Sequence, residues 1–130
     1  MEKAKVGWDD LVARFPEPYL VVAQLPDSSD EEALSNAHSA QKLMVRLIRK
    51  LPTQGVFAVK ISRQSGQRQI VCAFGDGSDA ASVANITRAS ISGRTSFFVL
   101  DESAEQELSK IAGPGATHRR ARATLLKWNS

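Results

Sequence analysis

The chain has 130 residues, of which 42% are hydrophobic and 24% are charged. This length and this composition predict one folded domain and exclude a disordered chain, which would be less apolar. The formal net charge is +3, which on its own favours a partner that carries phosphate or carboxylate groups. Cys72 is the single cysteine, so no intrachain disulfide can form.

The N-terminal segment and the apolar runs bear on where the protein resides. The first ten residues carry five charged side chains and contain no apolar segment, so we expect no signal peptide. Apolar runs such as residues 19–23 are far too short to cross a membrane. We therefore expect a cytoplasmic protein that does not contact membranes.

Hydrophobic periodicity, capping residues and prolines divide the chain into helices and strands. The predicted elements, in chain order, are a helix at 8–15, a strand at 19–25, a helix from 28 or 29 to 51, strands at 55–63 and 68–74, a helix from 78 or 79 to 89, a strand at 95–100 and a helix from 103 to 111. The long second helix has the clearest signals. Ser28 and Ser29 are each followed by a glutamate three residues later, as in a capping box, and Pro52 stops the helix.

From residue 19 onward the predicted order is β-α-β-β-α-β, which is the ferredoxin-like pattern of an α+β fold. The chain adds an extra N-terminal helix, an extra C-terminal helix and a basic tail. A single α+β domain then covers residues 1–115, and residues 116–130 form a basic C-terminal tail or a short amphipathic helix. This arrangement places the first and third strands in the centre, in agreement with apolar residues on both of their faces.

The fourth predicted strand does not suit the edge position that this arrangement gives it. It is apolar throughout, and an uncovered apolar edge promotes aggregation. We expect a terminal helix, or the same strand of a second subunit, to cover it. The candidate self-association residues are Phe97, Phe98, Val99 and Leu100.

Residues that carry chemistry are sparse. His38 and His118 are far apart in the sequence, and neither has an evident carboxylate nearby to orient it. Cys72 lies in an apolar run and reads as a small buried hydrophobic residue. We therefore predict no catalytic, cofactor-binding or metal-binding residues, and no cofactor.

A glycine-containing turn at residues 74–79 lies between a predicted strand and a predicted helix, where phosphates often bind. Asp76 and Asp79 would repel a phosphate, and the other ligands of a calcium-binding loop are missing. We interpret this segment as the capped start of a helix.

Charge is segmented along the chain. Residues 42–94 hold nine basic and two acidic side chains, whereas residues 1–41 and 95–115 are acidic and residues 116–130 are basic. A polar hairpin at residues 60–69 and the tail are the two basic features that could contact nucleic acid or an acidic partner. The candidate contacts are Lys60, Arg63, Arg68, Arg119, Arg120, Arg122 and Lys127.

Residues 19–26, followed by Asp30, Glu31 and Glu32, resemble the first strand and the helix start of an RNA-recognition motif. That family displays aromatic side chains on its third strand for base stacking. The corresponding segment here has only Phe74, at its end, so no binding role is transferred from the resemblance.

Three hypotheses follow. The first is a non-catalytic binding or regulatory module that is homo-oligomeric and recognises an acidic protein partner or nucleic acid. The second is a dedicated nucleic-acid-binding protein that uses the 60–69 hairpin and the basic tail. The third is a small enzyme with its site in a sheet cleft or at a dimer interface, which rests on analogy with the fold alone.

Overall fold

A computed structural model describes residues 4–26, 30–52, 55–64 and 66–113. The predicted tail at 116–130 lies outside the described residues, together with its candidate contacts Arg119, Arg120, Arg122 and Lys127. The helices and strands, in chain order, are β1 (Ala4–Lys5), α1 (Trp8–Arg14), β2 (Tyr19–Gln24), α2 (Asp30–Lys50), β3 (Val56–Gln64), β4 (Gln67–Phe74), α3 (Gly77–Thr87), β5 (Ser90–Ser92), β6 (Thr95–Val99) and α4 (Glu102–Ala112).

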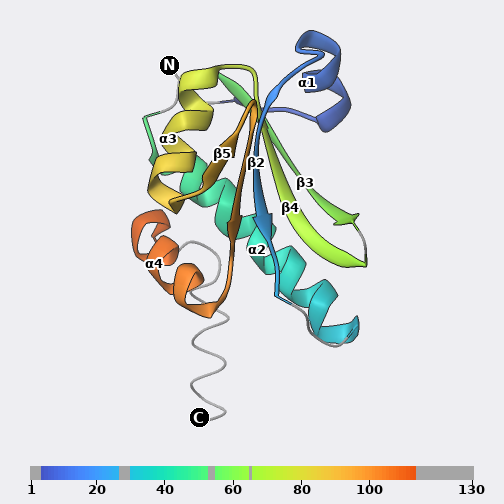
Figure 1. Cartoon of the computed structure of the whole chain (residues 1–130), viewed down its shortest axis with the longest axis vertical. Coiled ribbons are helices and arrows are strands. Elements are labelled where there is room, and N and C mark those ends of the chain that lie inside the picture. Colours follow the sequence, from blue (N-terminus) through green and yellow to red (C-terminus); the bar gives the residue numbers. More distant parts are fainter. Residues whose placement is uncertain (1–3, 27–29, 53–54, 65, 114–130) are drawn as a thin grey trace.

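The fold is α+β, as predicted, and it is built on one mixed sheet with the strand order β1-β3-β4-β2-β6-β5 (Figure 1). The strands β2 and β4 are central and pair antiparallel, which confirms the positions predicted for the strands at 19–25 and 68–74. Their apolar residues on both faces are explained by neighbours on both sides and by helices on both faces of the sheet.

The prediction that residues 95–100 form an edge strand is wrong. After α3 the chain forms a β-hairpin, in which β5 pairs antiparallel with β6 and takes the outer position. Gly93, with a φ of +64°, allows the tight turn between the two strands. β6 therefore lies between β5 and β2 and runs parallel to β2, and the ferredoxin-like topology is not confirmed.

The main core lies between the sheet and a layer formed by α2, α3 and α4 (Figure 1). Met44, Leu47 and Ile48 of α2 pack there against alternate residues of the central strands. The rings of Phe57 and Phe74 stack in this core, with centroids 6.5 Å apart. Both aromatic side chains have almost no exposure, so each buries a large apolar surface in this core.

A smaller cluster lies on the opposite face, where α1 covers one end of the sheet. Leu11 is fully buried there against Ala58 and Ala73, and the ring of Phe15 packs beside them. A Cβ atom on Gly75 would lie 2.6 Å from that ring, so only glycine allows this close approach. The rest of this face has no helix over it among the described residues (Figure 1).

Candidate functional site

The basic hairpin does not present its cations on one surface. Arg63 and Arg68 are direct partners across the β3–β4 ladder, and strand alternation places both on the side of the sheet that α2 covers. Lys60 lies on the other side, with its ammonium group 4.1 Å from the ring centroid of Trp8. The structure thus brings two of the three described candidate contacts together and separates the third.

Other cations of the basic middle segment also lie apart. Arg49 and Lys50 end α2, where positive charge suits the helix dipole. Arg94 stacks on the ring of Tyr19 at 4.5 Å and donates to the carbonyl oxygen of Glu17 at 3.0 Å. The charge segmentation of the sequence therefore does not become a single basic face in the described part of the chain.

The candidate self-association residues divide between the core and the surface. Phe98 and Leu100 are buried under the helices, whereas Phe97 is 39% exposed and Val99 is 53% exposed. Ile91 on β5 is 65% exposed, the most of any large hydrophobic side chain that the structure describes. Ile91 is the partner of Ser96 and so lies on the helix-covered side of the sheet, whereas Phe97 and Val99 lie on the opposite side.

Among the described residues, no strand pairs with the outer side of β5. The N–H of Leu100 donates to Gln24 of β2, so alternate residues of β6 bond to β2 and Phe97 faces β5. Because Phe97 is the partner of Ser90 and Thr95 is the partner of Ser92, these two serines bond inward and Ile91 points its N–H and C=O outward.

Edge strands usually carry protection against pairing with another chain, such as lysine, proline or a bulge. The edge strand β1 at the opposite side of the sheet ends on Lys5. β5 consists of two serines and an isoleucine, and in the part of the chain that the structure describes its short length is the one such device that it has. It is therefore an uncharged sheet edge with an exposed apolar side chain at its centre.

The turn at residues 74–79 is a capped helix start, as predicted, but the cap is Asp76 and α3 begins at Gly77, before the predicted start at 78 or 79. The Asp76 side chain accepts hydrogen bonds from the backbone N–H and from the hydroxyl of Ser78, at 2.8 and 2.7 Å, and these bonds lower the pKa of Asp76. A feature that we missed is the burial of Asp79, which is only 2% exposed and accepts from the N–H of Gly55 at 2.8 Å. Asp76 therefore holds the turn together, and Asp79 ties it to the segment before β3.

Cys72 is fully buried, as its apolar surroundings predicted. Burial raises the pKa of its thiol to about 12, because the thiolate would have to form away from water. The side chain is therefore inert at neutral pH.

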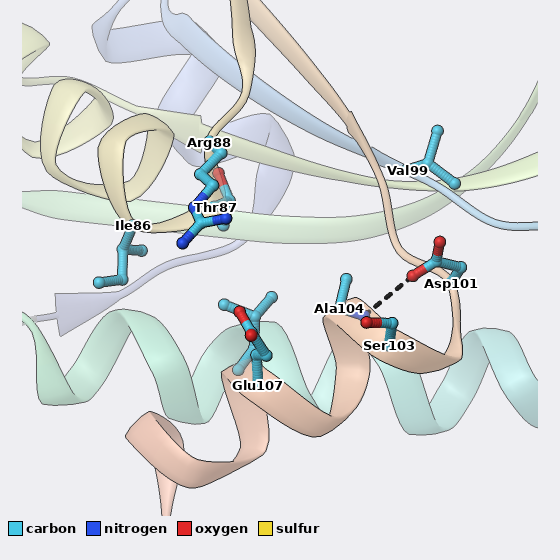
Figure 2. A pocket seen from close by; sticks show the side chains of 9 residues that line it. Ile86, Thr87, Arg88, Val99, Asp101, Ser103, Ala104 and Glu107 are labelled. Atoms are coloured by element: carbon cyan, nitrogen blue, oxygen red, sulfur yellow. Dashed lines mark hydrogen bonds between the residues drawn. The ribbon is translucent and has the colours of Figure 1, made fainter.

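A hollow of about 270 Å³ opens between the end of α3, the end of β6 and the start of α4 (Figure 2). The residues that line it are Ile86, Thr87, Arg88, Val99, Asp101, Ser103, Ala104, Glu107 and Leu108. One carboxylate of this lining has a structural role. Asp101 accepts a hydrogen bond from the N–H of Ala104 at 2.9 Å and caps α4. α4 thus begins at Glu102, one residue before the start that we predicted.

Sequence reasoning did not find this hollow. Its residues come from three elements, and no spacing in the sequence indicates that the end of α3 approaches α4. The lining contains no histidine, cysteine or lysine, so we do not assign catalysis to it. Among the described residues, no group of three or more potential ligands is placed to hold a metal ion.

The chain matches no known protein family, and neither the curated proteins nor the solved structures contain a significant match to it. In the part of the chain that the structure describes, none of the helices has the length and hydropathy needed to cross a membrane.

Proposed function

We propose that this chain is a non-catalytic binding module that acts as a homodimer, with two copies joined edge to edge through β5. The observation that carries the proposal is that β5 is an uncharged edge strand with an exposed apolar side chain. Ile91 is 65% exposed and directs its backbone N–H and C=O away from the sheet, and no charge protects the strand.

Antiparallel pairing of two β5 strands about Ile91 is self-complementary. The N–H of Ile91 in each copy would donate to the C=O of Ile91 in the other, which makes an isologous contact about a twofold axis. Directly opposite residues share a face, so the two Ile91 side chains would lie side by side and lose much of their exposure to water. The two sheets would then form one continuous sheet.

Replacement of Ile91 by lysine tests this proposal. We expect the wild-type chain to sediment as a dimer and Ile91→Lys to sediment as a monomer, because a lysine at the centre of the edge places two like charges against each other. Sedimentation equilibrium across a range of concentrations measures the masses. Ile111→Lys is the matched control, since Ile111 is also exposed, at 38%, but lies on α4.

Phe97→Ser distinguishes the edge from the uncovered sheet face. A dimer that forms through the face would lose its stability with Phe97→Ser and keep it with Ile91→Lys. That pattern would contradict the proposal, as would a wild-type chain that stays monomeric at every concentration.

Nucleic acid is the partner that we propose for the basic hairpin, as a second candidate. Arg63 and Arg68 face each other across the ladder, where like charges are unfavourable unless an anion lies between them. Binding to a single-stranded or duplex oligonucleotide would therefore weaken steeply as salt rises, because phosphate contacts release counterions.

Charge reversal checks that candidate. Arg63→Glu with Arg68→Glu is expected to lower oligonucleotide affinity by at least about tenfold in a fluorescence-anisotropy titration at low salt. Arg14→Glu on α1 is the control for net charge. Equal affinity of the wild-type chain and the double variant would remove the hairpin from consideration and leave an acidic protein as the partner to seek.

A further inference from the structure

We propose that the hollow between α3 and α4 binds a free α-amino acid with an apolar side chain. Its carboxylate would meet Arg88, and its ammonium group would meet Glu107. The hollow lies within one chain, so this proposal goes beyond self-association and does not depend on it.

The two walls of the hollow carry opposite charge. Figure 2 shows the Arg88 side chain extending from the end of α3 toward α4, and Glu107 rising from α4 on the facing side. Neither side chain forms an ion pair or a hydrogen bond with another described residue. Both charged groups are therefore available to a ligand.

The backbone at Arg88 gives an independent reason to look at this residue. It ends α3 in the left-handed conformation, with φ of 59° and ψ of 38°, and it is the one non-glycine residue with positive φ in the described chain. Glycine or asparagine adopts this conformation at lower cost and is the usual residue at such a helix end. An arginine at this position therefore needs a reason other than capping, and its guanidinium in the hollow supplies one.

Charge and size together define the ligand. A simple anion would be repelled by Asp101 and Glu107, and a simple cation would be repelled by Arg88, whereas a zwitterion satisfies both walls. A planar guanidinium binds a carboxylate through two hydrogen bonds. The hollow of about 270 Å³ has room for an amino acid with a branched apolar side chain.

Apolar side chains complete the site. Ile86 is 37% exposed at one end of the hollow, and Ala104 lines it from α4. Leu108 of α4 also lines the hollow and is already buried. An apolar ligand side chain would cover these surfaces, so leucine is expected to bind more tightly than glycine.

Isothermal titration calorimetry with leucine tests the proposal. We expect a dissociation constant between about 10 µM and 1 mM, since the ligand is small and the hollow is open to solvent. N-acetyl-leucine and leucinamide each lack one of the two charges and are expected to bind at least about tenfold more weakly. A leucine dipeptide that binds as well as leucine would contradict a site for the free amino acid.

Arg88→Gly separates a binding role from a structural one. Glycine suits the left-handed helix end, so we expect an unchanged or higher melting temperature together with a loss of leucine affinity of at least about tenfold. Glu107→Gln is expected to weaken binding in the same way, and Glu105→Gln is the control, because Glu105 is exposed on α4 but does not line the hollow.

The two proposals fail separately. The monomeric Ile91→Lys variant is expected to bind leucine with wild-type affinity, so loss of the dimer alone leaves this inference intact. No heat of binding with leucine, isoleucine or valine up to about 10 mM would overturn it. Wild-type affinity in Arg88→Gly would also overturn it.

Discussion

Phe74→Ala is expected to lower the melting temperature by about 10–20 °C, which corresponds to about 3–5 kcal/mol for the loss of a buried phenylalanine. Phe74 has no exposed surface and stacks on Phe57 in the main core. It also ends the central strand β4, immediately before the turn into α3. Its removal therefore leaves a cavity where the sheet and the helices meet.

Thermal unfolding followed by circular dichroism measures this effect, and Phe97→Ala is its matched control. The chemical change is the same, but Phe97 is 39% exposed on the uncovered sheet face. We expect it to cost less than about 1.5 kcal/mol. Equal losses at the two positions would mean that the core does not lie where the burial of Phe74 places it.

Asp79→Ala is expected to destabilise the chain by about 1–3 kcal/mol, because it leaves the N–H of Gly55 without its carboxylate acceptor. This hydrogen bond joins the start of α3 to the segment that enters β3, across 24 residues of sequence. Asp79→Asn retains an acceptor oxygen in nearly the same shape, so we expect a smaller loss. Urea denaturation gives both values, and an Asp79→Ala variant as stable as wild type would contradict the anchoring role.

Local sequence signals predicted most of the elements because those elements are long and periodic. The strand predicted at 19–25 and the helix predicted to end at residue 51 match β2 and α2 closely. β5 was not predicted, since three residues with one apolar side chain carry no periodicity. The direction of β6 and its position inside the sheet both depend on the β5–β6 hairpin. Without β5, the topology of the sheet could not be predicted.

Strand alternation explains why two groups of candidate residues, which we predicted to act together, are divided between the two faces of the sheet. With a period of two, Phe98 and Leu100 turn inward where Phe97 and Val99 turn outward. Lys60 and Arg63 are three residues apart in β3, which places them on opposite faces. Once each strand is assigned, the face on which each of these side chains lies can be predicted from the sequence. The hollow at Arg88 cannot, because it depends on how α3 packs near α4.

The most direct test of the proposed dimer is disulfide trapping with Ile91→Cys. Opposite residues of a hydrogen-bonded antiparallel pair have Cα atoms about 5.5 Å apart, a distance that a disulfide spans. Cys72 will not compete, because it is buried and burial raises the pKa of its thiol to about 12. Mild oxidation should convert Ile91→Cys to a covalent dimer and leave Ile111→Cys monomeric on a non-reducing gel. An Ile91→Cys chain that stays monomeric, or an Ile111→Cys chain that cross-links as readily, would contradict pairing through β5.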